Sequence, residues 1–194
     1  MAVFGDFLLV KMTIKDQDGK VLEEGKDKGD VYVYGLNRIL PKVDMELSKM
    51  KVGDKKTLVL EAGEAYGPVV PELVKTYPVS KFKQAPQVGD VLESRGPDGQ
   101  VFKGLVKKVE NGRITIDFNS PYAGKNLKFD LEVKGLAKDE VEKLKFTLIQ
   151  YDAENEIVSD TNNKKLTTKS KEVYEKVLPT IAFLFPEYEF KLEN

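Results

Sequence analysis

The fold is decided by residues 38–67, which read RILPKVDMELSKMKVGDKKTLVLEAGEAYG. Pro41 is typical of the first position of a helix, because the N–H that proline lacks would have no intrahelical partner there. Apolar residues then recur at helical spacing and give a short helix one apolar face: Val43, Leu47 and Met50. Gly53-Asp54 predicts a turn, and residues 56–60 predict a strand after it.

Apolar runs on the amino-terminal side of this stretch predict further strands. Residues 7–14 are largely apolar, and the turn residues 16–19, Asp-Gln-Asp-Gly, predict a hairpin that continues at Val21. Residues 31–35 alternate between small apolar and tyrosine side chains, as a strand does. The charged residues between these two runs predict a loop.

Two turn signals on the carboxyl-terminal side predict hairpins. Asp98-Gly99 and Asn111-Gly112 each lie between alternating apolar runs. Prolines punctuate the chain before them and disfavour a long helix. Residues 69–118 therefore predict a small antiparallel β unit.

The tail predicts a third unit of β–α–β order. Leu144, Phe146 and Leu148 alternate and predict a strand, while residues 188–192 alternate and predict a final strand. Between them lies a helical face that we expect to end at Pro179; its members are Val173, Tyr174, Val177 and Leu178. The apolar cluster 181–185 is favoured as the core of this unit, and the alternative is a surface for a homodimer through the C-terminal extension.

Composition excludes several classes of function. The chain has no histidine and no cysteine, which excludes disulfides, thiolate zinc sites, histidine-ligated metals and triads of the Ser-His-Asp or Cys-His kind. Carboxylate, lysine or tyrosine chemistry, oxygen-ligated ions, or a reaction without a titrating group remain open. We expect no cofactor and no metal site.

Charge and hydropathy limit the kinds of partner that we expect. Lysine and arginine (31) nearly balance aspartate and glutamate (32), so no basic field favours nucleic acid. No apolar run is long enough to span a bilayer, and the amino terminus lacks the cationic region of a signal peptide. We therefore expect a soluble, cytoplasmic protein with neither nucleic-acid nor membrane partners.

Two blocks of sequence carry a family resemblance. Residues 39–60, followed by Ala65-Tyr66-Gly67, resemble the FKBP-type peptidyl-prolyl cis-trans isomerases. Residues 118–129, FNSPYAGKNLKF, resemble the return segment of the SlyD-like branch, which carries a second domain inserted in the flap. The tail is similar in position and pattern to the extra C-terminal region of long archaeal members.

This resemblance implies an α+β fold: an FKBP-like antiparallel half-barrel wrapped on a short helix, with an inserted small β domain and a C-terminal α+β extension. It divides the chain into a first FKBP-like part, an insert-in-flap chaperone domain, a return strand and the extension. The corresponding ranges are 1–68, 69–118, 119–136 and 137–194.

The implied activity needs no titrating group. A prolyl peptide bond isomerises through a twisted amide, and the barrier to this rotation is roughly 20 kcal/mol. An apolar pocket favours this less polarised amide over the planar ground state, and a backbone N–H can hold a neighbouring carbonyl. That is differential binding of a transition state without a nucleophile.

The resemblance also implies roles for single residues. The Leu40 N–H would grip the substrate carbonyl, Tyr66 would lie at the rim, and Ile39 and Phe129 would contact the proline ring. The alternative from the residues alone is that all four are ordinary core. The remaining pocket positions depart from the family. Met12 lies where the family usually has tyrosine, Leu22 where it often has phenylalanine, and Glu23 where it has aspartate. Val43 lies where the best-known members have tryptophan, and Lys42 where glycine is usual.

In SlyD-like relatives the inserted domain binds unfolded chains, which implies a second surface. Apolar residues in the proline-rich run are the candidates, since the prolines should keep them off a regular core; the alternative is that they pack beneath the inserted sheet. They are Val70, Leu73, Val74, Tyr77 and Phe82. The implied function is a peptidyl-prolyl isomerase that assists folding and binds unfolded or proline-containing polypeptides. The alternative is a holdase chaperone whose isomerase pocket is degenerate.

Overall fold

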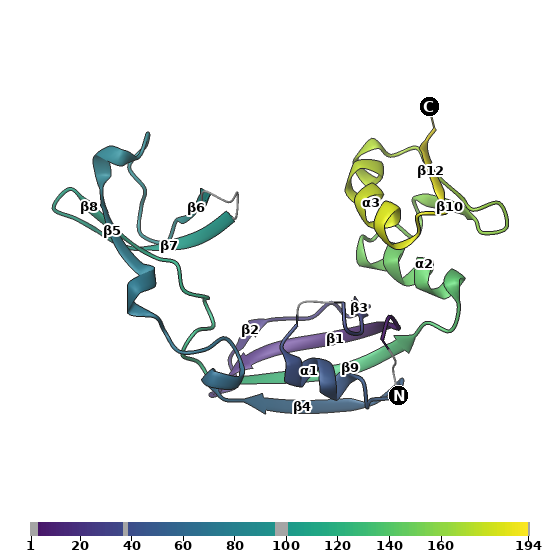
Figure 1. Cartoon of the computed structure of the whole chain (residues 1–194), viewed down its shortest axis with the longest axis horizontal. Coiled ribbons are helices and arrows are strands. Elements are labelled where there is room, and N and C mark those ends of the chain that lie inside the picture. Colours follow the sequence, from purple (N-terminus) through teal and green to yellow (C-terminus); the bar gives the residue numbers. More distant parts are fainter. Residues whose placement is uncertain (1–3, 37–38, 96–100, 194) are drawn as a thin grey trace. The chain divides into compact units, whose positions relative to one another are not determined.

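The chain folds into two compact units. The computed structural model describes residues 4–36, 39–95 and 101–193. The main unit comprises Met1–Val59 and Leu127–Asn194, and the insert unit comprises Leu60–Asn126 (Figure 1). Within the described residues no helix is both long enough and apolar enough to cross a membrane.

The main unit is built on an antiparallel sheet with the order β2-β1-β9-β4, in which β3 also pairs with β1. Its strands are β1 (Phe7–Asp16), β2 (Val21–Glu23), β3 (Asp30–Val33), β4 (Lys55–Leu60) and β9 (Leu127–Leu136). The predicted hairpin after β1 is confirmed, because the Asp16 carboxylate accepts the backbone N–H groups of Asp18 at 3.0 Å and Lys20 at 2.9 Å. Those contacts replace backbone bonds that the turn leaves unmade.

Helix α1 (Pro41–Leu47) lies against this sheet (Figure 1). Leu40 is its N-cap, in extended conformation with φ −61° and ψ 133°. The apolar face predicted from spacing is confirmed, since Val43 and Leu47 are fully buried. Along β9, alternate residues from Leu127 to Val133 are buried, so one face of the sheet packs inward.

The insert unit is an antiparallel sheet with the order β5-β8-β7-β6. Its strands are β5 (Val74–Pro78), β6 (Val91–Arg95), β7 (Val101–Glu110) and β8 (Arg113–Asp117). Asn111 and Gly112 both have positive φ, 48° and 70°, which confirms the predicted Asn-Gly turn between β7 and β8. The Asp98-Gly99 turn lies outside the described residues, although β6 and β7 pair as predicted.

The carboxyl-terminal elements differ from the predicted β–α–β order. They are α2 (Glu140–Gln150), β10 (Ile157–Asp160), β11 (Lys165–Thr168), α3 (Lys171–Leu184) and β12 (Glu189–Leu192). The prediction of a strand at residues 144–148 is wrong, because these residues lie in α2. The Asp139 carboxylate caps this helix by accepting the Glu142 N–H at 2.9 Å. Leu144 and Leu148 are buried four residues apart, so their spacing fits a helix as well as alternation.

The predicted helix end at Pro179 is also wrong, because α3 continues to Leu184. Proline in a helix interior removes one backbone hydrogen bond and costs about 3 kcal/mol. Burial on both sides of it offsets this cost, since Val177, Ile181 and Phe185 are all buried. Ile181 and Phe185 of the apolar cluster 181–185 are buried in the core, as favoured, and Leu184 packs against it, whereas Ala182 and Phe183 are exposed.

The carboxyl-terminal elements share a hydrophobic core with β1 and β3. The Phe7 and Phe185 rings lie 6.2 Å apart, and Val31 and Val33 belong to the same cluster. All of Phe7–Val10 is buried, on both faces of the sheet. A strand that is covered on both faces does not need to alternate apolar and polar residues, which explains the continuous apolar run of β1.

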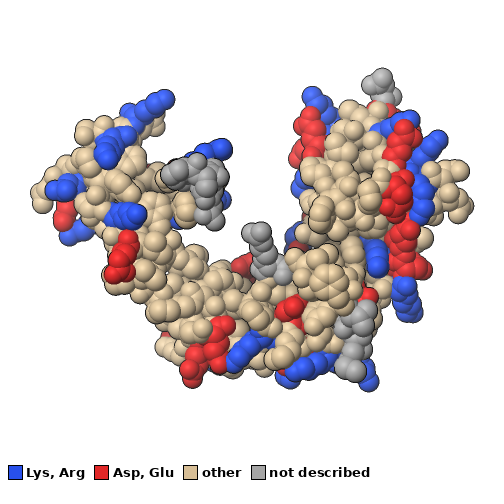
Figure 2. Space-filling model, viewed as in Figure 1, with Lys and Arg blue, Asp and Glu red and all other residues tan. Residues whose placement is uncertain are grey.

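The α+β class is thus confirmed, with a main antiparallel sheet and helix, a separate inserted sheet and a C-terminal α+β region. Figure 2 shows basic and acidic side chains beside one another on the face it displays, in accord with the formal net charge of −1.

Helix α3 offers a matched pair of variants. Ile181 is 1% exposed and Phe183 is 77% exposed. Ile181→Ala is expected to lower the free energy of unfolding by about 2–5 kcal/mol, because it leaves a cavity in the shared core. Phe183→Ala should change it by less than about 0.5 kcal/mol. Urea unfolding measures both, and equal losses would contradict this placement of the cluster.

Candidate functional site

A cleft of about 320 Å³ opens in the main unit, and we name it the α1 cleft. It is lined by β1, by the end of β2 and the loop after it, by β3, by Ile39 and Leu47 around α1, and by Gln150 at the end of α2. From the strands and the loop come Val10, Met12, Glu23, Glu24, Gly25, Asp30, Val31 and Tyr32. Apolar side chains thus alternate with carboxylates around a hollow of small-ligand size.

Tyr32 is fixed in the wall of the cleft. Its hydroxyl donates to Asp44 Oδ1 at 2.7 Å, and the side chain is 6% exposed. Burial first, and the hydrogen bond to Asp44 second, raise the pKa of the Tyr32 phenol above its usual value of 10.0. Asp44 lies in the first turn of α1, where a carboxylate also complements the helix dipole. The pair therefore ties β3 to α1.

The loop between β2 and β3 approaches β1 very closely. A Cβ atom on Gly25 would lie 2.4 Å from the Met12 carbonyl oxygen and 2.6 Å from the Met12 nitrogen. Only glycine avoids this clash with backbone. The cleft wall at Gly25 and Met12 therefore depends on the absence of a side chain.

Ionic contacts hold the same loop. Lys11 of β1 pairs with Asp27 of the loop. Lys26 Nζ donates to the backbone carbonyl of Gln150 at 2.9 Å, and Lys28 Nζ pairs with Glu154 Oε1 at 2.6 Å. The Lys28 ammonium lowers the pKa of Glu154, so both groups stay charged at neutral pH.

The structure brings several of the predicted pocket residues together. Met12, Glu23 and Ile39 all line the α1 cleft. Leu40 follows Ile39 as the N-cap of α1, and its carbonyl accepts the Val43 N–H at 2.9 Å. These residues come from strand, loop and helix cap, and the fold alone makes them neighbours.

Other predicted pocket residues do not line the cleft. Val43 and Phe129 are fully buried beneath the surface of the main unit, and Leu22 is half-buried in β2. Tyr66 belongs to the insert unit, where its ring packs on Tyr122 with the centroids 5.0 Å apart. Phe129 thus occupies the core position that the alternative interpretation gave it, and Val43 lies in the core beside the cleft rather than on its surface.

Several lining residues were missed from the sequence, among them Tyr32 and Gln150. Val31 and Tyr32, neighbours on β3, both line the cleft, so the alternation in residues 31–35 does not by itself mark Tyr32 as a cleft residue. Gln150 gave no signal, because the prediction for this region was a strand rather than α2. Its position depends on tertiary packing.

The insert unit separates its predicted binding residues into two groups. The expectation that they stay off a regular core is wrong for Tyr77 and Phe82, which pack on Val106, Ile114 and Ile116. The exposed members are Val70, Leu73 and Val74. Their exposure leaves them available to a partner.

A groove of about 640 Å³ also lies in the insert unit, and we name it the insert groove. Exposed apolar side chains line it, namely Val69, Val91 and Leu105, and the lysines around it are Lys103, Lys107 and Lys125. Strand β6, at an edge of the inserted sheet, contributes Val91. The groove thus adjoins a strand edge with an apolar lining.

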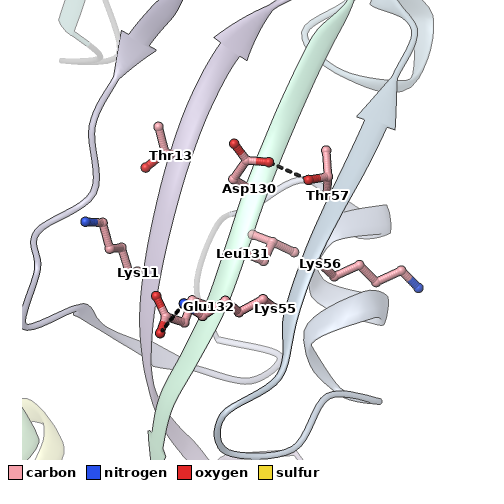
Figure 3. A pocket seen from close by; sticks show the side chains of 8 residues that line it. All are labelled: Lys11, Thr13, Lys55, Lys56, Thr57, Asp130, Leu131 and Glu132. Carbon is pink, nitrogen blue, oxygen red and sulfur yellow. Dashed lines mark hydrogen bonds and ion pairs between the residues drawn. The ribbon is translucent and has the colours of Figure 1, made fainter. Parts of the chain in front are cut away.

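Figure 3 shows a further hollow on the main sheet, of about 330 Å³, where side chains of β1, β9 and β4 meet. Asp130 accepts a hydrogen bond from Thr57 Oγ1 at 2.5 Å and pairs with Lys15 at 2.7 Å, and Glu132 pairs with Lys134 at 2.9 Å. These partners lower the pKa of both carboxyls, Lys15 most for Asp130 and Lys134 most for Glu132. Such carboxylates are poor proton donors, so this surface is a salt-bridged sheet face.

Among the described residues no group of three or more acidic, histidine or cysteine side chains is placed to hold a metal.

Comparisons with known proteins agree on one family. The model of the FKBP-type peptidyl-prolyl cis-trans isomerases matches residues 1–134. The FKBP-type 16 kDa peptidyl-prolyl cis-trans isomerase of Escherichia coli (strain K12) is 32% identical over 130 residues, 65% of this chain and 87% of that protein. The FKBP-type isomerase SlyD of the same strain is 28% identical over 134 residues, 68% of each. The short-type peptidyl-prolyl cis-trans isomerase of Methanocaldococcus jannaschii is 27% identical over 156 residues, 71% of this chain and 96% of that protein.

The Tyr32–Asp44 contact predicts a pH dependence. A phenol whose pKa is raised in the folded state contributes stability that is present below the ordinary pKa of 10.0 and lost as pH rises above it. Stability of the wild type should therefore fall faster than that of Tyr32→Phe above about pH 10. At neutral pH the variant should lose about 1 kcal/mol with the hydrogen bond. Urea unfolding across this range measures the difference, and parallel curves would contradict it.

Proposed function

The chain belongs to the FKBP-type peptidyl-prolyl cis-trans isomerases, and from this we propose that the α1 cleft is where it isomerises the bond before proline. Its substrates are proline-containing polypeptides. The observation that carries the proposal is the convergence of Met12, Ile39 and Tyr32 on one cleft beside the N-cap of α1. Met12 and Ile39 offer apolar surface to a proline ring, while the carboxylates of Glu23, Glu24 and Asp30 lie elsewhere around the cleft.

The cleft suits isomerisation better than acid–base chemistry. A twisted prolyl amide is less polar than the planar one, so apolar side chains such as Met12 and Ile39 stabilise it relative to the ground state. Tyr32 keeps its proton through Asp44 and burial, and it therefore serves as fixed apolar surface rather than as a base. The reaction needs shape and desolvation from these residues.

Leu40 and Ile39 keep the roles that the family suggests, whereas Phe129 is buried and does not reach the cleft surface. We assign the Leu40 N–H to the substrate carbonyl, with Ile39 against the proline ring. Val43 and Phe129, fully buried, support the wall from within the core. For Tyr66 the role at the rim rests on the Ala65-Tyr66-Gly67 sequence alone.

We also place the chain in the SlyD-like branch, with residues 69–118 as an insert-in-flap domain between residues 1–68 and 119–136. Similarity to SlyD supports this, as does the position of the inserted sheet between β4 and β9. Residues 137–194 are then the extension of the long archaeal type.

A second activity is chaperone binding of unfolded chains by the insert unit. The insert groove supports it, because exposed Val69, Val91 and Leu105 lie beside the edge strand β6. An extended segment added at such an edge is held by main-chain hydrogen bonds, which tolerate many sequences. The lysines around the groove would favour segments with acidic residues. Should the pocket be degenerate, this binding would be the main function.

The cleft is tested by two methionine variants. Met12 lines the α1 cleft, whereas Met45 lies on α1 outside it and is exposed. Met12→Ala is expected to lower kcat/KM for a short proline-containing peptide about tenfold, or about 1.4 kcal/mol, since it removes apolar wall. Met45→Ala should leave it unchanged. Equal activity of both variants would place isomerisation elsewhere, and circular dichroism checks that both are folded.

The insert groove is tested separately by aggregation of an unfolded protein. When Val91 and Leu105 are both replaced by serine, about ten times more of the variant than of the wild type should be needed to suppress this aggregation, because apolar contact area is lost. Val88→Ser is the control, since Val88 is exposed but lies outside the groove. Peptide isomerisation should be unaffected. Unchanged suppression by the double variant would rule out the groove as the binding surface.

A further inference from the structure

One wall residue of the α1 cleft lies outside the family match. That match ends at residue 134, while Gln150 is the last residue of α2 in the C-terminal extension. Gln150 nevertheless lines the same cleft as Met12 and Ile39. The extension therefore contributes directly to the surface that a substrate would meet.

The end of α2 is held firmly in place. Helix α2 packs on β3 and β1 through a core that includes Leu144 and Leu148. Next to Gln150, the Tyr151 hydroxyl and Thr180 Oγ1 of α3 lie 2.5 Å apart. Ala153, fully buried, donates its N–H to the Leu148 carbonyl at 3.0 Å. Gln150 is thus presented from a fixed helix end.

The end of α2 also contacts the loop after β2, which forms another part of the cleft wall. Lys26 Nζ donates to the Gln150 carbonyl at 2.9 Å, and Lys28 pairs with Glu154 at 2.6 Å and with Asp152 at 3.6 Å. These lysines belong to the loop that carries Glu24 and Gly25 into the cleft. Loop and extension therefore form one continuous wall.

We propose that Gln150 is a specificity-determining residue of the isomerase cleft, contacting the substrate chain beside the proline. This inference rests on the proposed function of the α1 cleft. A carboxamide offers both a donor and an acceptor, so it matches the N–H and C=O of a peptide backbone. It is also neutral among the carboxylates of Glu23, Glu24 and Asp30, so a charged residue in its place would change the net charge that a neighbouring substrate side chain meets.

The test reverses that balance. The full chain is compared with Gln150→Lys and Gln150→Glu on three short peptides that carry lysine, alanine or glutamate immediately before proline. Gln150→Lys is expected to shift the ratio of kcat/KM for the glutamate peptide over the lysine peptide about tenfold upward, and Gln150→Glu about tenfold downward. The changes should fall in KM, with kcat within about twofold, because a uniform binding contact is altered.

A control on the same helix separates contact from general charge effects. Lys145 is exposed on α2 and does not line the cleft. Lys145→Glu changes the charge of the helix and should leave the peptide ratio unchanged. A shift as large as that of the Gln150 variants would overturn the inference, because the effect would then be long-range.

Two outcomes distinguish failure of this inference from failure of the proposed site. Unchanged ratios in both Gln150 variants, together with an activity loss in Met12→Ala, would overturn the role of Gln150 and leave the cleft in place. Full activity in Met12→Ala would reject the cleft itself. Gln150→Glu is nearly isosteric, so it carries the test if Gln150→Lys does not fold.

Discussion

The main unit depends on one strand that is hydrogen-bonded along both edges. Strand β1 pairs with β9 from Leu8 to Asp16 on one edge, and with β3 and β2 on the other. Such a strand has few unpaired backbone groups, and its position fixes the positions of its neighbours. Met12 lies in the middle of β1, with Leu131 of β9 opposite it. Met12 is therefore held by the pairing of β1 with β9, while the loop after β2 lies along its other side.

Coverage of β1 on both faces couples the C-terminal extension to this sheet. Phe7 and Leu9 belong to the same core as α2 and α3, and Lys143 lies over the Phe7 ring. Separating the extension would expose this apolar surface at a cost of roughly 25 cal/mol per Å². The extension is thus a structural part of the main unit, although it lies beyond the residues that the family shares.

Local chemistry explains which parts of this fold could be predicted. Pro41 and the apolar spacing after it gave α1, and Asn111-Gly112 gave the β7–β8 turn, because each depends on backbone preferences of a few residues. Helix α2 was missed because Leu144, Phe146 and Leu148 fit alternation, although Asp139 with Glu142 three residues later is a capping signal. Pro179 was taken as a helix end because its local cost is visible in sequence, and the core burial that offsets it is not.

The same division applies to the cleft. Met12, Glu23 and Ile39 could be named because the family pattern marks their positions. Gln150 could not, since it reaches the cleft through the packing of α2 on β3.

A site that works by shape and desolvation needs rigid walls more than it needs titrating groups. The least regular wall here is the loop after β2, which has no strand partner of its own. It is instead held by Gly25 against the Met12 backbone and by lysines paired across to the end of α2. The charged residues of this loop thus fix its position beside Met12, and the proposed site depends on them without needing their chemistry.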